Sequence, residues 1–411
     1  MPKLFHVTTV THTLHFLIGQ IGFMQQSGME VHAVSSVDPT GDEKLDFFKQ
    51  HEDVTHHAVE ISRSLTPIRD LISVWSLFQL FKKHQPEIVH AHTPKAGLVA
   101  ILASFLAGVP VRVYHIHGLR FSTLTGWKRA LVIACEKLTC KLATRVLCVS
   151  PSAKAEAVIA GLASHKDIRV LESGSINGLD ATGRFDPDGL DPDAGLDVRN
   201  RLGIAGDDVV VGFIGRLVRD KGIEELVEAW QTVHSTKSSQ QQTHLLLVGD
   251  YESQDPVSEK TKRLIETDST IHRLDYDPET PKLYAAMDVF CLPSYREGLP
   301  YVALEAAAMR LPVITTNATG CVDGVEDGIT GTCVSVGRSD ALAAAIRRYV
   351  FDRGLRLWHG NAGRRRILQE FRPANVWEAT LAEYCELLED TNCELPIATS
   401  NDKANRQTKA A

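Results

Sequence analysis

Short segments made almost entirely of apolar residues alternate with longer segments whose apolar positions recur at helical spacing along the first 180 residues. Since strands this apolar are buried on both faces, the pattern predicts a parallel sheet covered by helices. The predicted strands are 4–10, 30–36, 54–61, 87–93, 111–117, 145–149 and 168–172, and the helices include 65–84, 95–107, 126–143 and 152–161.

A second series of the same kind begins at residue 208, after a stretch rich in glycine, proline and aspartate. Its predicted strands are 209–214, 244–248, 271–274, 288–292 and 312–316, and its helices are 222–233, 279–287, 300–309, 340–351, 355–370 and 376–388. We expect an α/β protein in which two Rossmann-like domains face a cleft. The expected boundaries are a first domain at 1–173, a linker at 174–207, a second domain with C-terminal helices at 208–390 and a disordered tail at 391–411.

Composition narrows the class of protein. Apolar residues make up 44% and charged residues 23% of the chain, and the net charge of −7 does not favour nucleic-acid binding. The cysteines form no CxxC pair, which favours a reducing compartment. The N-terminus lacks the apolar region of a signal peptide, and the longest apolar run, 96–111, is too short to span a bilayer. These features predict a cytoplasmic protein.

Positive charge gathers in one part of the first domain. Residues 112–145 hold seven Lys or Arg and a single acidic residue, Glu136. Trp127, Leu131 and Leu138 add apolar positions along the helix predicted there. This combination is typical of a helix that lies on an anionic membrane surface. The alternative is an ordinary amphipathic helix that covers the sheet.

A cationic turn follows the apolar strand predicted at 209–214. Gly215 and Arg216 open the turn, and Lys221 and Gly222 close it before a helix. Glycine lets a ligand approach the backbone, and the helix that follows offers free N–H groups and positive dipole. Arg216 can hold a phosphate through two hydrogen bonds, and Lys221 adds a point charge. The alternative is a solvated turn with two surface cations.

Two glutamates follow the apolar strand predicted at 288–292. Glu297 stands with Gly298 and Leu299 in a loop, and Glu305 lies within the apolar helix predicted at 300–309. A carboxylate in apolar surroundings is costly unless it binds something. The alternative is one charge that complements a helix dipole and one exposed helical glutamate.

Histidines suggest a further possibility. His90 and His92 share one strand face, as do His115 and His117. Four imidazoles would converge if these strands are neighbours. No carboxylate or thiolate is spaced to join them, so we expect histidines that bind substrate or backbone and no metal site.

The two C-terminal motifs together resemble the donor-binding domain of glycosyltransferase family 4, a family of retaining enzymes with the GT-B fold. The matching pattern is Gly215-Arg216, four residues, Lys221, and later Glu297 and Glu305 with seven residues between them. The resemblance extends over residues 3–390. The first domain is similar to the subgroup that builds capsular, O-antigen or lipid-linked oligosaccharides.

The resemblance implies a role for each matched residue. Arg216 and Lys221 would grip the diphosphate of a nucleotide sugar, and Glu305 would bond the ribose hydroxyls. Glu297 would face the sugar at the reacting centre, and Gly215, Gly298 and Leu299 would belong to the same donor-binding site. His117 would contact the donor sugar from the first domain. The list of implied site residues is therefore Gly215, Arg216, Lys221, Glu297, Gly298, Leu299, Glu305 and His117.

We therefore expect a retaining glycosyltransferase that needs neither cofactor nor metal. Its donor would be a nucleotide-diphosphate sugar, with UDP-N-acetylhexosamine or UDP-hexose as first choice. Its acceptor would be a saccharide on a polyprenyl-diphosphate carrier, met at the inner membrane surface. Two alternatives stay open: a nucleotide-sugar 2-epimerase of the same architecture, and a non-catalytic GT-B subunit of an assembly complex.

Overall fold

The structure is a computed structural model of the 411-residue chain, and it describes residues 1–37, 42–62, 66–235 and 242–391. The chain forms two compact α/β units. Unit 1 comprises residues 1–149, 154–177 and the segment from residue 373 onwards, and unit 2 comprises 150–153 and 178–372. The predicted tail, 391–411, lies outside the described residues except for Thr391.

Unit 1 is built on a parallel sheet of seven strands in the order β3-β2-β1-β4-β5-β6-β7. After β3, at one edge of the sheet, the chain crosses back to place β4 beside β1 and then adds strands toward the other edge. This strand order is that of a Rossmann domain. The strands are β1 (Lys3–Val10), β2 (Glu30–Ser36), β3 (Thr55–Ala58), β4 (Ile88–His92), β5 (Val111–Ile116), β6 (Arg145–Cys148) and β7 (Ile168–Arg169).

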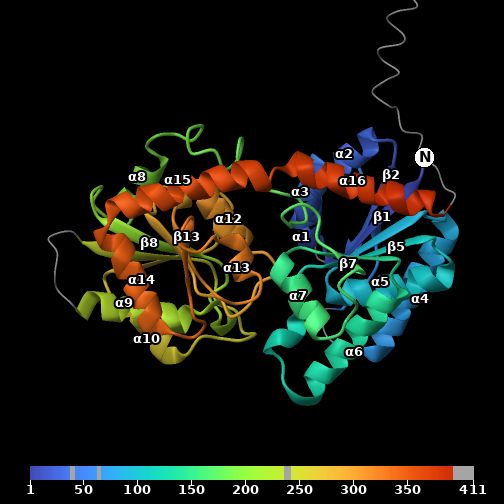
Figure 1. The fold of residues 1–411 in the computed structure, drawn as a ribbon, viewed down its shortest axis with the longest axis horizontal. Helices are drawn as coiled ribbons and strands as arrows, with labels where there is room; N and C mark the ends of the chain where they lie inside the picture. Colours follow the sequence, from blue (N-terminus) through green and yellow to red (C-terminus); the bar gives the residue numbers. More distant parts are fainter. Residues whose placement is uncertain (38–41, 63–65, 236–241, 392–411) are drawn as a thin grey trace, which may run out of the picture. The chain divides into compact units, whose positions relative to one another are not determined.

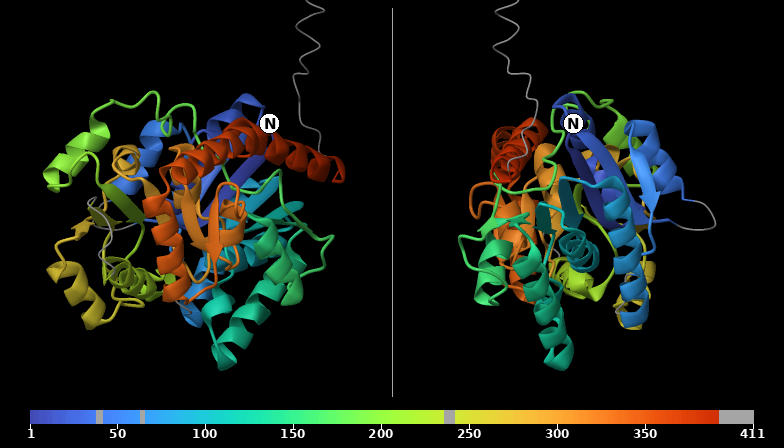
Figure 2. Two further views of the ribbon diagram at one scale, coloured as in Figure 1. Left: turned by 60° about the vertical axis from the view of Figure 1, so that its left-hand side comes forward. Right: turned by 90° about the vertical axis from the view of Figure 1, so that its right-hand side faces the viewer.

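Helices cover the sheet of unit 1 (Figure 1). They are α1 (Thr11–Leu14), α2 (Gln20–Gln26), α3 (Glu43–His51), α4 (Pro67–His84), α5 (Pro94–Ala107), α6 (Gly126–Leu142), most of α7 (Pro151–Ile159), whose first three residues belong to unit 2, and α16 (Pro373–Glu389). α5 packs between α4 and α6 against β4 and β5, and Figure 2 shows these three helices on the same side of the strands. β4 is buried throughout and β1 is buried except at its two end residues, as the apolar pattern predicted.

Unit 2 repeats this plan with six parallel strands in the order β10-β9-β8-β11-β12-β13. The strands are β8 (Val209–Ile214), β9 (Thr243–Val248), β10 (Ile271–Leu274), β11 (Val289–Leu292), β12 (Val313–Thr316) and β13 (Gly331–Val334). The helices are α8 (Ala194–Arg201), α9 (Ile223–Ser235), α10 (Glu259–Thr267), α11 (Thr280–Ala285), α12 (Tyr301–Ala308), α13 (Cys321–Gly324), α14 (Ser339–Phe351) and α15 (Arg353–Glu370). The prediction of two Rossmann-like domains is confirmed.

The last helix departs from the expected boundary. α16 belongs to unit 1, whereas the sequence placed everything up to residue 390 in the second domain. Its Trp377 donates from Nε1 to Asn177 Oδ1 at 2.6 Å. Its Glu383 accepts from Arg169 Nη1 at 2.9 Å. The amphipathic pattern indicates that a helix has an apolar face, but it does not identify the domain that covers that face.

The predicted linker also contains structure that the sequence did not indicate. Residues 178–207 belong to unit 2, and α8 within them packs against α11. Arg199 anchors this helix, because its Nε donates to Ala286 O at 2.9 Å and its Nη2 to Asp288 Oδ2 at 2.7 Å. α8 is short and polar apart from a few buried positions, so it lacks the hydrophobic stripe by which helices are predicted.

Candidate active site

The two predicted motifs of unit 2 lie side by side at the carboxyl edge of its sheet. β8 and β11 are neighbouring parallel strands, with Phe290 opposite Gly212. The cationic turn leaves β8 and the glutamate loop leaves β11, so both begin at the same edge. Tyr295 N donates to Asp220 O at 2.9 Å, and Arg296 pairs with the Asp220 carboxylate at 2.9 Å. These bonds join the two loops.

Lys221 and Glu297 form the centre of this arrangement. Lys221 Nζ lies 2.5 Å from Glu297 Oε1, and both side chains are largely buried. Ser294 Oγ donates to the same Glu297 oxygen at 2.7 Å. The cation of one motif is thus held against the carboxylate of the other, as a charge-assisted hydrogen bond.

Two glycines let the backbones approach closely enough for this contact. Gly222 has φ +72°, and a Cβ built on it would lie 2.1 Å from Pro293 O. Gly320 has φ +79°, and a Cβ there would lie 2.4 Å from Glu297 O. Glu297 N also donates to Thr319 O at 2.9 Å. Side chains larger than hydrogen at either glycine would push the loops apart.

Gly298 and Leu299 lead from Glu297 into α12. The carbonyl of Gly298 accepts a hydrogen bond from Ser150 Oγ at 2.6 Å, and Leu299 is buried. The helix begins at Tyr301, one position later than predicted, and Pro300 is the residue before it. The free N–H groups at the beginning of α12 are therefore separated from Glu297 in the chain by three residues, Gly298, Leu299 and Pro300.

Glu305 projects from the second turn of α12 and is half-buried. Tyr284 on α11 donates its hydroxyl to Glu305 Oε2 at 2.8 Å. Desolvation raises the pKa of the Glu305 carboxyl, and the bond from Tyr284 works against this shift. The carboxylate is therefore neither the exposed helical glutamate of the alternative interpretation nor an unpaired buried charge.

Arg216 stands apart from this pair. Its Nη1 lies 2.9 Å from Glu252 Oε2, and more than half of its side chain is exposed. The structure therefore brings together Lys221, Glu297 and Ser294, and it places Arg216 in a separate exposed ion pair. Ser294 and Tyr284 are partners whose roles the sequence did not indicate, and the only available signal was that polar side chains stand near the charged motif in the sequence.

The histidines of unit 1 form a cluster on neighbouring strands. His6 comes from β1, His90 and His92 from β4, His115 from β5, and His117 directly follows β5. Successive rings lie 4.2–5.9 Å apart between centroids. The four predicted imidazoles do converge, and His6 is a fifth member that the sequence analysis missed, because only strand order reveals that β1 borders β4.

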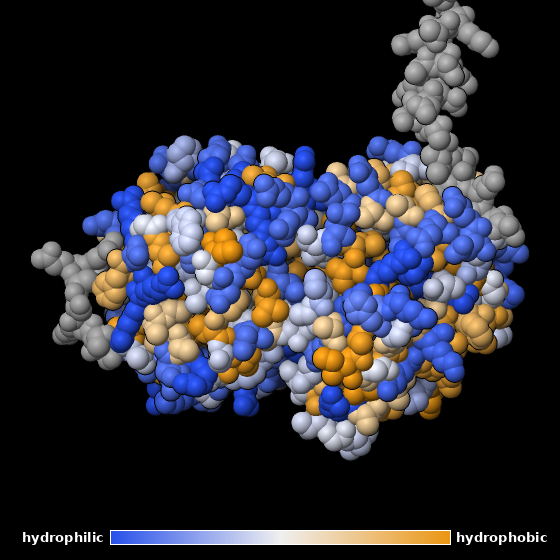
Figure 3. Space-filling view, viewed as in Figure 1, coloured by the Kyte–Doolittle hydropathy of each residue, from blue (hydrophilic) through white to orange (hydrophobic). Residues whose placement is uncertain are grey.

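The basic segment forms α6, whose two faces differ. Glu136 faces inward and accepts a hydrogen bond from Tyr114 at 2.7 Å. Trp127, Leu131 and Leu138 are exposed on the outside, with Trp127 at 71%. Figure 3 shows apolar patches among polar residues over the part of unit 1 where Figure 1 places α6. The helix thus covers the sheet and also presents apolar side chains to the surface. Among the described residues, no helix is long and apolar enough to cross a membrane.

Comparison with known proteins identifies the class. The family model for glycosyl transferases group 1 matches residues 197–366, and that for the glycosyl transferase 4-like domain matches residues 22–174. The chain is 33% identical over 389 residues to the capsular polysaccharide biosynthesis glycosyltransferase CapM of Staphylococcus aureus, which covers 95% of this chain and 98% of that protein. The two-domain fold and these matches define a glycosyltransferase enzyme of the GT-B fold. The chain belongs to the group 1 glycosyltransferases.

Two further comparisons extend this result. The chain is 27% identical over 312 residues, 76% of its length and 78% of the other, to the UDP-Gal:alpha-D-GlcNAc-diphosphoundecaprenol alpha-1,3-galactosyltransferase of Escherichia coli. Its fold matches the crystal structure of Anabaena Alr3699/HepE in complex with UDP with a TM-score of 0.75, at 23% identity and with 93% and 99% of the two chains covered. The structural match supports the GT-B fold.

Proposed function

We propose that this enzyme is a retaining, metal-independent glycosyltransferase that moves a sugar from a UDP-sugar to a saccharide on a polyprenyl-diphosphate carrier. The observation that carries the proposal is the Lys221–Glu297 pair, 2.5 Å between Nζ and Oε1, at the carboxyl edge of the sheet. Ligands of open α/β sheets bind at this edge. When a sugar–phosphate bond breaks, negative charge develops on the phosphate and positive charge on the sugar. The cation and the anion held at this edge are opposite in sign to these two charges.

Lys221 would stabilise the negative charge that gathers on the departing diphosphate. Arg216 would leave Glu252 and add a second cation, which its exposure allows. The N-terminus of α9 supplies further positive potential. Glu297 would stabilise the positive charge on the sugar, as carboxylates do for oxocarbenium-like transition states. In this scheme the side chains and helix terminus provide the positive charge that a divalent cation provides in other transferases.

Glu305 would bond the ribose of the nucleotide. Tyr284 occupies one of its carboxylate oxygens at 2.8 Å, which leaves the other for ligand hydroxyls. A carboxylate accepts from two adjacent hydroxyls at little cost, because both donate to it. His117, on unit 1, is proposed to contact the donor sugar. Gly215 and Gly298 are proposed to let the donor approach the backbone, and Leu299 belongs to the same proposed donor site.

The choice of donor and acceptor is supported by the relatives. One is named as a transferase of galactose from UDP-Gal to a diphosphoundecaprenol-linked sugar, and another as a capsular polysaccharide enzyme. We propose a UDP-hexose or UDP-N-acetylhexosamine as donor and surface polysaccharide as the product. The acceptor would lie at the cytoplasmic face of the membrane, and the outer surface of α6 would contact its anionic lipids.

A direct assay tests this proposal. Purified enzyme is incubated with UDP-galactose, UDP-glucose, UDP-GlcNAc or UDP-GalNAc, with and without a GlcNAc-diphospho-lipid acceptor, and the products are resolved by mass spectrometry and NMR. The expected product is an acceptor extended by one sugar whose anomeric configuration matches that of the donor. An inverted linkage would refute the retaining assignment. A changed sugar nucleotide without acceptor would indicate the epimerase, and no turnover of any donor would favour a non-catalytic subunit.

A further inference from the structure

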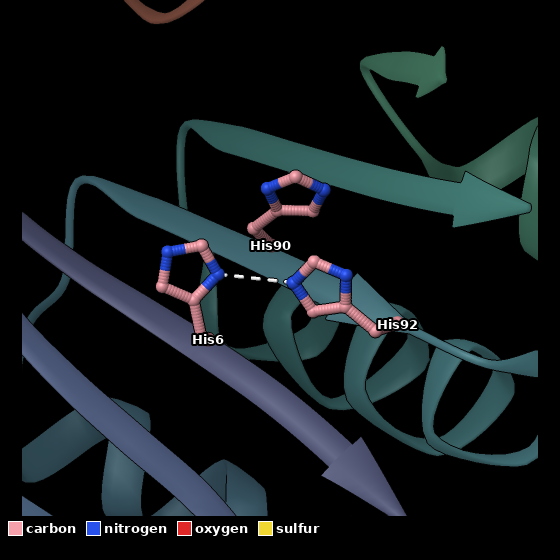
Figure 4. Close-up of side chains that lie close together, drawn as sticks. All are labelled: His6, His90 and His92. Carbon is pink, nitrogen blue, oxygen red and sulfur yellow. Dashed lines mark hydrogen bonds between the residues drawn. The ribbon is translucent and has the colours of Figure 1, made fainter. Parts of the chain in front are cut away.

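Three of the buried histidines form a hydrogen-bonded chain across three strands. His6 Nδ1 lies 3.0 Å from His92 Nε2, and His92 Nδ1 lies 3.1 Å from His117 Nε2. Figure 4 shows the first of these contacts between β1 and β4. His92 is the central member and uses both of its ring nitrogens. His6 and His92 are fully buried, whereas His117 is half-buried and forms the accessible end of the chain.

All three imidazoles are neutral at physiological pH. Burial lowers the pKa of His6 to about 3 and that of His117 to about 4. Burial, and then the neighbouring imidazoles, hold the pKa of His92 well below its ordinary value. A neutral imidazole has one N–H donor and one bare nitrogen acceptor. Each member of the chain therefore carries a single proton.

One proton on each ring couples the three tautomers. If His92 carries its proton on Nδ1, it donates to His117 Nε2, so the proton of His117 must be on Nδ1. The bare Nε2 of His92 then accepts from Nδ1 of His6. If His92 carries its proton on Nε2, both bonds reverse. The chain therefore has two complete arrangements, with all three protons on Nδ1 or all three on Nε2.

We propose that His92 and His6 are positioning residues that set the tautomer of His117, and that the three rings switch together when a ligand contacts His117. This inference rests on the proposed function for the identity of that ligand, a sugar hydroxyl of the donor. A hydroxyl that accepts from His117 Nδ1–H selects the first arrangement, and one that donates to a bare Nδ1 selects the second. The contact at the accessible end is thereby coupled to His6, two strands away.

The same cluster presents an alternative, which the test must separate. His6, His90 and His92, and likewise His92, His115 and His117, each place ligand nitrogens within 4.8 Å of one another, so either set could hold a metal ion. The neutral chain accounts for the 3.0 and 3.1 Å contacts without an ion. Neither set includes a carboxylate or thiolate to offset the cost of burying a divalent charge.

Tautomers are measured by NMR on protein labelled with ¹⁵N in its histidine rings, with signals assigned by single substitution. The expected result, on ligand-free enzyme, is the same tautomer for His6, His92 and His117. A mixed set would overturn the proposal. Addition of UDP-sugar should then change the tautomer populations of His117 and His6 to the same extent. Stoichiometric zinc in the purified protein, or zinc binding that shifts the rings of His6 and His92 first, would assign the cluster to a metal instead.

Kinetics of paired variants separate positioning from packing. His6→Asn keeps a polar group near Nδ1 and can still bond His92, whereas His6→Leu cannot. We expect His6→Leu to lower turnover by about 10-fold or more, which is the size of loss seen when partners that orient metal-binding histidines are removed, and His6→Asn to restore much of it. His115→Leu, in the same cluster but outside the chain, is the packing control. Equal losses of turnover in His6→Leu, His6→Asn and His115→Leu would refute the coupling. Because the NMR measurement needs no turnover, failure of the glycosyl-transfer assay would leave the tautomer result interpretable.

Discussion

Lys221 Nζ and Glu297 Oε1 are 2.5 Å apart, although 75 residues separate the two along the chain. The contact exists because β8 and β11 are neighbours in the sheet and the loops that follow them are joined at Asp220. Each charge limits the cost of burying the other. The pair therefore links the stability of these loops to the chemistry proposed for them. Substitution of either residue tests this link.

Replacing Lys221 by alanine should lower kcat/KM by about 30- to 1,000-fold, because one contact to the charged transition state contributes ~2–4 kcal/mol. Lys260, an exposed lysine on α10, provides the matched control as Lys260→Ala. Steady-state kinetics with saturating acceptor gives the comparison, and the thermal midpoint tells whether the variant is folded. Kinetics that match those of the control would remove Lys221 from the site.

Sequence patterns predicted the sheet strands of both units more reliably than their polar helices. Central strands such as 209–214 are continuous apolar runs and appear where they were expected. α8 and α10 were missed because their few buried positions do not make a hydrophobic stripe. β13 was missed because it is short and lies at the edge of the sheet, beside β12 only.

The assembly of the candidate site could be predicted only in part. The residue types and spacing made Lys221, Glu297 and Glu305 candidates, but spacing alone does not show which side chains meet. The strand order 10-9-8-11-12-13 determines that Lys221 meets Glu297. The partners of Glu305 and Arg216, namely Tyr284 and Glu252, depend on side-chain directions in loops and helices that no periodicity encodes.

Buried Glu136 should make the stability of unit 1 pH-dependent. Burial raises the pKa of its carboxyl to about 7, so the folded state binds this proton more tightly than the unfolded state does. The contribution of Glu136 to stability is then fully present below pH ~4.5 and falls by about 3 kcal/mol as the pH rises to ~7. Glu136→Gln, which can still accept from Tyr114, should abolish this slope. Urea unfolding at pH 5 and pH 8 gives the free energy of unfolding of both proteins. An equal dependence of this free energy on pH in the variant would contradict the prediction.

Removal of divalent metal should leave glycosyl transfer intact. Arg216, Lys221 and the N-terminus of α9 are proposed to neutralise the diphosphate, so the reaction has no step that requires a metal ion. Activity is measured after dialysis against EDTA and again after addition of Mg²⁺ or Mn²⁺. Loss of activity that manganese restores would contradict the proposed mechanism.

The outer surface of α6 should bind anionic membranes. Lys128 and Arg129 are exposed beside Trp127, and each basic residue near an anionic surface contributes about 1 kcal/mol. Reversal of both charges to glutamate should weaken binding to phosphatidylglycerol vesicles by at least ~10-fold, with Lys260→Glu as control. Salt should release the protein, because exposed charges are screened beyond ~8–10 Å at physiological ionic strength. Equal sedimentation with neutral and anionic vesicles would reject the electrostatic contribution.

His117 and Glu305 should affect different steps of the reaction. His117 is proposed to contact the sugar, where bonds change, whereas Glu305 is proposed to hold the ribose, which does not react. An interaction that is stronger in the transition state alters kcat, and one that is equal in both states alters binding. We therefore expect His117→Ala to lower kcat by about 100-fold with little change in the Kd for UDP, since loss of one hydrogen bond to the transition state typically costs about 10²–10³-fold in kcat.

Glu305→Gln should show the reverse, with weaker UDP binding and a smaller loss of kcat. Loss of one hydrogen bond to a charged group costs ~1.5–3 kcal/mol, which corresponds to a Kd about 10- to 150-fold higher. Tyr284→Phe removes the hydroxyl that contacts Glu305 and Val302 O, leaves the Glu305 carboxylate in place, and should have an intermediate effect on Kd. Calorimetric titration with UDP and initial rates with acceptor are measured on the same preparations. If His117→Ala instead lowers the thermal midpoint and keeps its turnover per folded molecule, His117 is a packing residue at the end of β5. The sugar contact would then have to come from another side chain.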